Sequence, residues 1–278
     1  MLAVESDWQR ARAKVSRSSF YVAMRLMPKP RREAMFAIYA FNRAIDDIAD
    51  EGDFAAAERL AQLDLWRAAI DAIYAGAQSP EALAAVASQY GLRREDFLAV
   101  IEGVAMDATG ASLAPDFATL DHYCDCVASA VGRLSIKIFG MDEEPGFRLA
   151  HHLGRALQFT NILRDLAEDA SLGRLYVPRE ILAEAGIPNT NPQQVLAHPM
   201  IDGACRTFAQ LAERHYEQAD LILCSGAKGM LQAPRLMSAV YHRLLKKMKQ
   251  AGWRPPQPRV HVGRAPLLLL ALRHGLSR

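Results

Sequence analysis

The chain has 278 residues, of which 51% are hydrophobic and 23% charged, and this length fits one large domain or two small ones. The composition is that of a globular protein with enough apolar side chains to form a core. A formal net charge of +2, with no basic tract interleaved with aromatic residues, argues against a nucleic acid partner. The four cysteines form no CxxC pair, which predicts free thiols in a reducing compartment such as the cytoplasm.

Helical periodicity dominates the chain and alternation with a period of two residues is scarce. We therefore expect an all-α fold, with residues 1–278 in a single domain. The helices expected in chain order span about residues 31–50, 54–75, 80–90, 93–110, 117–140, 146–170, 202–224 and 231–251. Glycines and prolines predict ordered loops at 173–179 and 186–200.

A short apolar run, 265–272, follows a proline-rich segment at the C-terminal end. It is far shorter than the roughly 18 apolar residues that a membrane span requires. Arg264 and Arg273 flank it, so it could lie in a membrane interface, but we favour a core helix. The N-terminal stretch lacks the apolar core of a signal peptide. We expect a cytoplasmic location, with peripheral contact at the inner face of the membrane as the alternative that this run leaves open.

Residues 158–169, with the sequence QFTNILRDLAED, place a polar stripe on an otherwise apolar helix. At spacings of three, four and four residues, the stripe consists of Gln158, Asn161, Asp165 and Asp169. Residues three and four apart share a helical face. Carboxylates are costly to bury without cations or hydrogen-bond partners, so this stripe predicts a binding site.

A second helix, within residues 37–50, repeats this arrangement in the sequence AIYAFNRAIDDIAD. Its stripe, at spacings of four, three and four residues, consists of Tyr39, Arg43, Asp46 and Asp50. Two such helices facing one cavity would form a magnesium site for a phosphate-containing substrate, because Mg²⁺ prefers hard oxygen ligands and shares them with phosphates. The arginine adds a forked donor for phosphate oxygens. Metal and arginine together would stabilise a departing diphosphate, so that its carbon can ionise.

An acid pair four residues apart is weak evidence when it stands alone. Outside the two motif regions, the same spacing occurs in the pairs Asp121/Asp125, Glu180/Glu184 and Glu213/Glu217. Most pairs of this kind belong to solvated helix faces, and a surface helix is the alternative interpretation of either motif taken alone. The two motifs together favour a site, because both carry further polar groups in register and lie among apolar residues.

No competing catalytic signature is present: the sequence lacks GxSxG, GxxxxGK[ST], HExxH and GxGxxG. His151 and His152 are adjacent, so we expect them to face different sides of a helix and to make an unconvincing metal pair. His122, Cys124 and Cys126 alternate in a way that suits ligands on a strand, whereas a helix is expected there. We interpret the two cysteines as packing residues.

The chain resembles the squalene and phytoene synthase family. DDIAD (46–50) and QFTNILRDLAED (158–169) are similar to the two aspartate-rich motifs of that family in spacing, order and flanking residues. The similarity extends from SSFYVAMRLMP (18–28) through GRLYVPRE (173–180) to the C-terminal helices. Within the family, the stretch 18–52 is most similar to bacterial presqualene diphosphate synthases of the hopanoid pathway.

The resemblance implies an all-α isoprenoid synthase helical bundle around a central cavity. It also implies Mg²⁺-dependent head-to-head (1′-1) condensation of two farnesyl diphosphate molecules to presqualene diphosphate, with several Mg²⁺ ions. No dinucleotide fingerprint is present, so NADPH is not expected. A phytoene or dehydrosqualene synthase of the same fold is the enzyme alternative, and a catalytically inactive helical assembly partner is the non-enzyme alternative. Downstream enzymes of the hopanoid pathway are suggested as partners.

The resemblance also implies roles for individual residues. Mg²⁺ and diphosphate would be held by Asp46, Asp50, Asn161, Asp165 and Asp169. Contacts with the diphosphate or the cavity would come from Phe20, Tyr39, Arg43, Gln158, Arg164, Tyr176, Tyr241 and Arg259. Either Tyr123 or the released diphosphate would accept the proton, and Asp47 lies off the stripe. For Tyr241 and Arg259, a core aromatic and a surface arginine are equally good interpretations.

Overall fold

The computed structural model describes residues 2–14, 21, 24–25, 27–50, 54–77, 80–188, 190–255 and 260. Phe20, Arg259 and the apolar run 265–272 lie outside these residues, so the predictions made for them stay predictions. Within the described ranges, the regular secondary structure is helical and contains no strand, which confirms the all-α prediction. No helix in these ranges is long and apolar enough to cross a bilayer.

The described helices lie between Leu2 and Ala251. In order they are α1 (Leu2–Lys14), α3 (Lys29–Asp50), α4 (Ala56–Tyr74), α5 (Glu81–Tyr90), α6 (Arg94–Thr109), α7 (Phe117–Cys124), η2 (Asp125–Ser129), α8 (Ala130–Phe139), α9 (Glu143–Ser171), α10 (Arg179–Glu184), α11 (Pro192–Leu196), α12 (Ile201–Cys224) and α13 (Gln232–Ala251).

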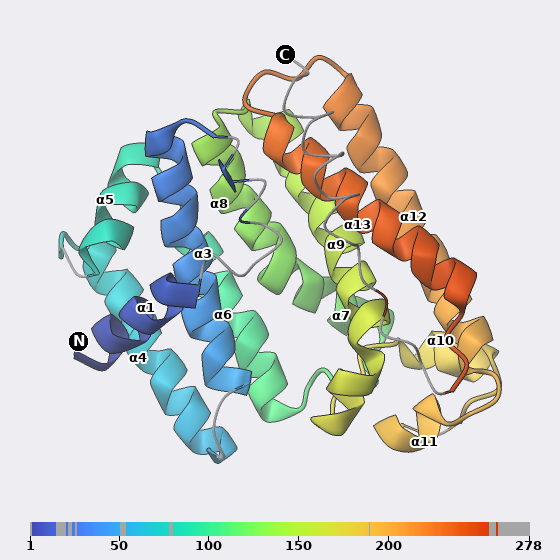
Figure 1. The fold of residues 1–278 in the computed structure, drawn as a ribbon. Coiled ribbons are helices and arrows are strands. Elements are labelled where there is room, and N and C mark those ends of the chain that lie inside the picture. Colours follow the sequence, from blue (N-terminus) through green and yellow to red (C-terminus); the bar gives the residue numbers. More distant parts are fainter. Residues whose placement is uncertain are drawn as a thin grey trace.

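The helices form two groups around α8 (Figure 1). Helices α1, α3, α4, α5 and α6 gather on one side, and α9, α12 and α13 on the other. Helix α8 contacts both α3 and α9, while α9 also packs on α12 and α13. Because the two acid motifs lie on α3 and α9, this arrangement places them on opposite sides of the space beside α8.

Two sequence expectations change in detail. The single helix expected at 117–140 consists of α7, a π-helical turn η2 and α8. One extra residue per turn rotates the following helix relative to the preceding one, and such turns are frequent at functional sites. The loop expected at 186–200 contains the short helix α11, which Asn191 caps by accepting a hydrogen bond from the Gln194 backbone amide.

Close packing between η2, α8 and α9 depends on two glycines. A Cβ added at Gly154 would lie 2.9 Å from the Ser129 backbone nitrogen, and one at Gly132 would lie 2.9 Å from the Ala150 Cβ. Neither position can carry a side chain without separating the helices. The buried apolar side chains form one continuous cluster that includes all of these helices. That continuity supports the prediction of one domain, which for the full chain remains a prediction.

Candidate active site

Both acid motifs border one apolar cavity of about 300 Å³. Helix α3 contributes Tyr39 and Asp46 to its lining, and α9 contributes Gln158 and Asn161. The remaining wall is mainly methionine, leucine, isoleucine and valine from α3, α8, α9 and α13. Two members of each stripe therefore line this cavity, and its apolar wall suits a long apolar group. Asp165 instead lines a separate pocket of about 140 Å³.

A second, more polar pocket of about 570 Å³ begins one turn further along α3. Asp50 lines it, together with Asp107 at the end of α6 and Arg174 in the loop after α9. Because Asp46 and Asp50 are one helical turn apart, the first motif connects the apolar cavity to this polar pocket.

The motif carboxylates repel one another. Desolvation by the surrounding protein raises the pKa of Asp46 to about 7, and the charge of Asp50 adds to this, although Arg43 opposes it. The Asp46 side chain is accessible through the cavity but is surrounded by protein, which excludes most bulk water. Desolvation also raises the pKa of Asp169 to about 7, followed by the charge of Asp165, with Arg174 opposing. Such a cluster of carboxylates favours the binding of a cation.

Asn161 provides a further oxygen for a cation. Its amide nitrogen donates to Gln158 Oε1 at 3.3 Å, whereas its own Oδ1 is buried and has no hydrogen-bond partner. Buried oxygens without partners are rare in folded proteins. An amide oxygen beside carboxylates is a donor set that Mg²⁺ accepts, so these side chains fit that ion.

Two of the predicted ligands are paired with arginines. Arg164 donates through Nε to Asp165 Oδ1 at 2.8 Å and also contacts the other carboxylate oxygen. The hydroxyl of Tyr241, buried on α13, also interacts with Arg164, so Tyr241 lies beside the second motif. Arg174 contacts Asp50 Oδ1 at 2.9 Å. Both guanidinium groups carry the forked donors that match carboxylate and phosphate oxygens.

The first motif contains one acid that is set apart from the others. Arg43 forms an ion pair of 2.7 Å with Asp47, four residues later. Asp47 lines a different pocket, of about 360 Å³, which includes Val4 and Arg10 of α1. It therefore lies off the stripe, as expected, while Arg43 still lowers the pKa of Asp46.

Asp107 is a central residue that the sequence did not reveal. It accepts hydrogen bonds from the hydroxyls of Tyr123 at 3.0 Å, Tyr176 at 2.8 Å and Ser112 at 2.6 Å. The Tyr123 and Tyr176 rings are stacked, with centroids 5.1 Å apart. Burial raises the pKa of Asp107, and the three hydrogen bonds partly oppose this. The charge of Asp107 raises the pKa of both Asp46 and Asp169, so it stands between the motifs.

Arg174 is the second residue that sequence reasoning missed. Besides Asp50, it binds the Ala49 carbonyl at 3.1 Å, and its charge acts on Asp107 and Asp169. It thereby joins the end of α3 to the loop after α9. The loop was predicted to be ordered, but no local pattern pairs an arginine with an aspartate 124 residues earlier.

Two interpretations of polar residues were wrong. Asp121 and Asp125 are not merely a solvated face: Arg155, only 2% exposed, binds Asp121 Oδ1 through Nε at 2.6 Å, and Arg133 binds Asp125 at 3.1 Å. His151 and His152 do not face different sides, because their rings contact each other with centroids 4.8 Å apart. Cys124 and Cys126 are buried and free, as predicted.

Residues 13–265 match the model of a family described as squalene/phytoene synthase. The chain belongs to the squalene/phytoene synthase family. The presqualene diphosphate synthase of Zymomonas mobilis subsp. mobilis is 51% identical over 270 residues, which cover 96% of this chain and 92% of that relative. The presqualene diphosphate synthase of Sinorhizobium fredii is 47% identical over 262 residues, covering 93% of each chain. The predicted family membership is confirmed.

Solved structures of squalene/phytoene synthase type have the same fold. A dehydrosqualene synthase in complex with a ligand superposes with a TM-score of 0.82 at 24% identity, covering 98% of this chain and 96% of the other. A squalene synthase from Alicyclobacillus acidocaldarius gives a TM-score of 0.78 at 26% identity, covering 92% and 97%.

For this squalene/phytoene synthase family member, we expect a pH-dependent effect of Mg²⁺ on stability. Burial raises the pKa of Asp46 and of Asp169 to about 7 in the folded protein, against an ordinary value of 3.8 for an aspartate. In the metal-free protein, burying these two carboxyl groups costs no stability below the unfolded pKa, where both are protonated in the folded and the unfolded state. The cost grows as the pH rises and is complete above the folded pKa. Mg²⁺ cancels the repulsion, so it should raise the melting temperature by several degrees more at about pH 8 than at about pH 6.

Thermal melts in EDTA and in Mg²⁺ at these two pH values would check this expectation. A double variant with Asp46→Asn and Asp169→Asn is the matched control, because it keeps the shapes and removes both titrations. A benefit from Mg²⁺ that does not change with pH in the unmodified protein would contradict the raised pKa values.

Proposed function

We propose that the chain catalyses the head-to-head (1′-1) condensation of two farnesyl diphosphate molecules to presqualene diphosphate. Three relatives with that printed activity are 45–51% identical to it over nearly its whole length. The observation that carries the proposal is the pair of acid stripes, on α3 and α9, that border one apolar cavity.

The apolar cavity suits the prenyl chains. Its wall includes Met35, Ile38, Leu153 and Met237, which cannot attack a carbocation. Loss of the first diphosphate leaves an allylic cation, and the 2,3-double bond of the second substrate attacks that cation. An apolar wall excludes water, and this protects the cation from hydrolysis.

The polar end of the site suits the diphosphates. Members of this family typically use Mg²⁺. In this chain we propose that the ion is held by Asp46, Asp50, Asn161, Asp165 and Asp169. The unpartnered Asn161 Oδ1 and the crowded carboxylates support this proposal. When bound, the metal neutralises the leaving diphosphate. Arg43, Arg164 and Arg174 would bind the remaining phosphate oxygens, because guanidinium groups match their geometry.

Tyr123 and Asp107 provide a path for the proton that is lost when the cyclopropane closes. The Tyr123 hydroxyl already donates to Asp107 Oδ2, so its oxygen can accept the substrate proton while it passes its own proton to Asp107. Burial, followed by the charge of Asp107, raises the pKa of Tyr123, so the phenol alone is not ionised and needs this partner. The breaking C–H bond supplies the electron pair that closes the ring.

Asp107→Asn should reduce turnover by about 10–100-fold, because the amide keeps the shape but cannot accept the proton and holds Tyr123 less well. Product formation from farnesyl diphosphate with saturating Mg²⁺ measures this. Asp64→Asn is a matched control, since Asp64 is an exposed acid whose partner is Arg67. Normal turnover in Asp107→Asn would exclude the relay.

The proposed activity is tested by incubating the purified protein with farnesyl diphosphate and Mg²⁺, with and without NADPH, and identifying products by mass spectrometry. Presqualene diphosphate should accumulate in both reactions. Squalene formed directly with NADPH, or dehydrosqualene formed without it, would show that the site ionises the intermediate a second time. Preferential coupling of C20 substrates would favour a phytoene synthase.

The proposed substrates and product carry long apolar chains, so they partition into membranes. A cytoplasmic protein that touches the inner face of the membrane peripherally would exchange such molecules with the bilayer. Downstream enzymes of the hopanoid pathway would then be the partners that receive the product. Both proposals rest on the proposed activity.

A further inference from the structure

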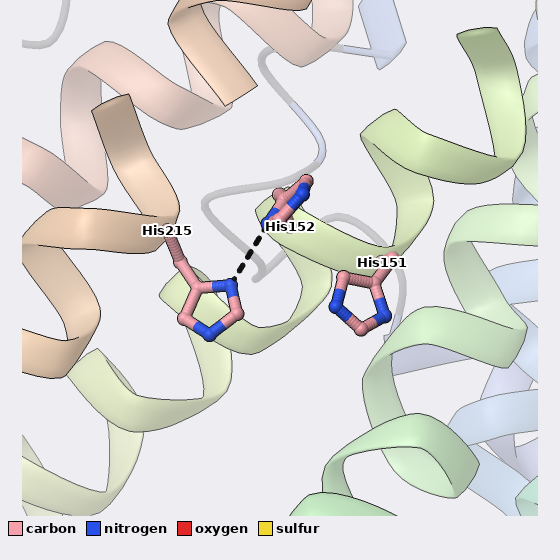
Figure 2. Close-up of side chains that lie close together, drawn as sticks. All are labelled: His151, His152 and His215. Carbon is pink, nitrogen blue, oxygen red and sulfur yellow. Dashed lines mark hydrogen bonds between the residues drawn. The ribbon is translucent and has the colours of Figure 1, made fainter. Parts of the chain in front are cut away.

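Three histidines meet at the contact between α9 and α12, away from the carboxylates. His151 and His152 lie on α9, and His215 lies opposite them on α12 (Figure 2). His152 Nδ1 is 3.1 Å from His215 Nδ1. One ring nitrogen from each of the three histidines lies within 4.8 Å of the other two. All three side chains are half-buried, so a small ion can reach them.

Helix geometry explains how neighbours converge. Successive residues on a helix point about 100° apart, so two adjacent side chains can both reach a third that approaches from the facing helix. The three rings form a triangle: the ring centroid of His215 is 5.8 Å from that of His151 and 5.2 Å from that of His152, and the centroids of those two are 4.8 Å apart. Sequence spacing on α9 alone could not show this, because the third member lies 63 residues after His152.

The electrostatic surroundings keep these imidazoles neutral. Burial lowers the pKa of all three, to about 4 for His215, and Arg155 acts in the same direction on each of them, as the neighbouring histidines do on His152 and His215. Asp121 opposes this at His151 and His215, and it also binds Arg155 and so offsets much of the charge of that guanidinium. A neutral ring nitrogen is the form that binds a metal ion.

We propose that His151, His152 and His215 form a binding site for one transition metal ion of the zinc class, separate from the diphosphate site. Three imidazoles with room for a water match the ligand sets of Zn²⁺ and Co²⁺, whereas Mg²⁺ prefers oxygen ligands. Metal–nitrogen bonds of about 2.0–2.1 Å in a tetrahedron place the nitrogens about 3.3 Å apart. The His152–His215 pair is already at that separation, and a ring rotation at His151 would bring in the third.

The position of the site gives it a structural consequence. His151 and His152 precede Gln158 by about two helical turns, roughly 10 Å along α9. None of the three histidines is among the residues that line the apolar cavity. A bound ion would fasten α9, which carries the second acid motif, to α12 behind it. It would therefore stabilise the fold around the site without competing for the motif aspartates.

A Co²⁺ titration of the tag-free protein in excess Mg²⁺ tests the proposal, because Mg²⁺ occupies carboxylate sites and tetrahedral Co²⁺ has a characteristic visible absorption. We expect one equivalent to bind with that spectrum. His215→Ala and, separately, His152→Gln should weaken binding by about 100-fold or more. Circular dichroism would verify that both variants fold, and the half-buried His152 makes the second variant the gentler one.

Two matched variants control for other histidines. His198→Ala removes a histidine that only accepts a hydrogen bond from the Met200 backbone amide. His122→Ala dismantles the other group that could hold a metal among the described residues, Glu102, His122 and Cys126. Both controls should bind Co²⁺ as the unmodified protein does. Zn²⁺ at about 100 times its dissociation constant should raise the melting temperature by about 5 °C in the unmodified protein and not in His215→Ala.

Binding that is unchanged in His215→Ala, or lost in His122→Ala, would overturn the assignment. Absence of stoichiometric Co²⁺ binding would also overturn it, and would leave the three rings as a hydrogen-bonded cluster in which one Nδ1–H donates to the other Nδ1. None of these measurements depends on the condensation reaction, so failure of the metal site and failure of the proposed function are distinguishable.

Discussion

Alanine at any one of the four motif aspartates is expected to reduce turnover on the order of 10³-fold or more, while the protein stays folded. The four are Asp46, Asp50, Asp165 and Asp169. In the proposed site, each would help to bind the groups that stabilise the departing diphosphate, an interaction that is strongest in the transition state. The rate of presqualene diphosphate formation with saturating substrate and Mg²⁺ measures the effect.

Stability distinguishes site acids from structural acids. Burial, followed by the charges of neighbouring carboxylates, raises the pKa of Asp46 and Asp169, so replacing either one relieves desolvation and repulsion in the protein without metal. We expect their alanine variants to melt at the same temperature as the unmodified protein, or higher, in EDTA. Asp50 and Asp165 each lose an arginine partner instead, which costs about 0–1 kcal/mol for such accessible pairs.

Glu213→Ala provides the control. Glu213 forms an ion pair of 2.6 Å with Lys249 across α12 and α13, and both side chains are about 30% exposed. Losing it should change stability by no more than about 1 kcal/mol and leave turnover unaltered. A large loss of stability in the Asp46 or Asp169 variants, with normal activity in the folded fraction, would mean that these carboxylates serve the fold.

The sequence was sufficient to predict features that repeat along one helix. The stripes on α3 and α9 are visible because their members recur every three or four residues, and part of each stripe lines the same cavity. The period does not reveal which separate segments meet. Asp107 is a single aspartate in an apolar stretch, and its partners Tyr123 and Tyr176 lie 16 and 69 residues away.

Polar residues on helices were the hardest to interpret. The Asp121/Asp125 pair has the spacing of a solvated face, yet it neutralises the buried Arg155 of α9. Burying an arginine requires such partners, but local sequence does not show that Arg155 points inward at α7 and η2. Likewise, η2 shifts the register of the helix expected at 117–140, because one π-helical turn leaves no simple mark in composition.

Removal of divalent metal is expected to reduce turnover by about 10³-fold or more, and added Mg²⁺ should restore it fully. The carboxylates alone would repel a diphosphate, because they already crowd one another: burial, together with the charge of Asp107, raises the pKa of both Asp46 and Asp169. The nearby arginines cannot replace the metal, because each is already in an ion pair with an aspartate. The pairs are Arg43–Asp47, Arg164–Asp165 and Arg174–Asp50.

The measurement is product formation after exhaustive treatment with EDTA, followed by titration with Mg²⁺. Adding Ca²⁺ provides a control for charge alone, because Ca²⁺ is larger and tolerates irregular coordination, whereas Mg²⁺ demands a near-octahedral set of oxygens. Asn161→Ala should require more Mg²⁺ for half-maximal activity, since it removes a buried amide oxygen that has no hydrogen-bond partner beside the acids. Full turnover in EDTA would contradict a metal-dependent site.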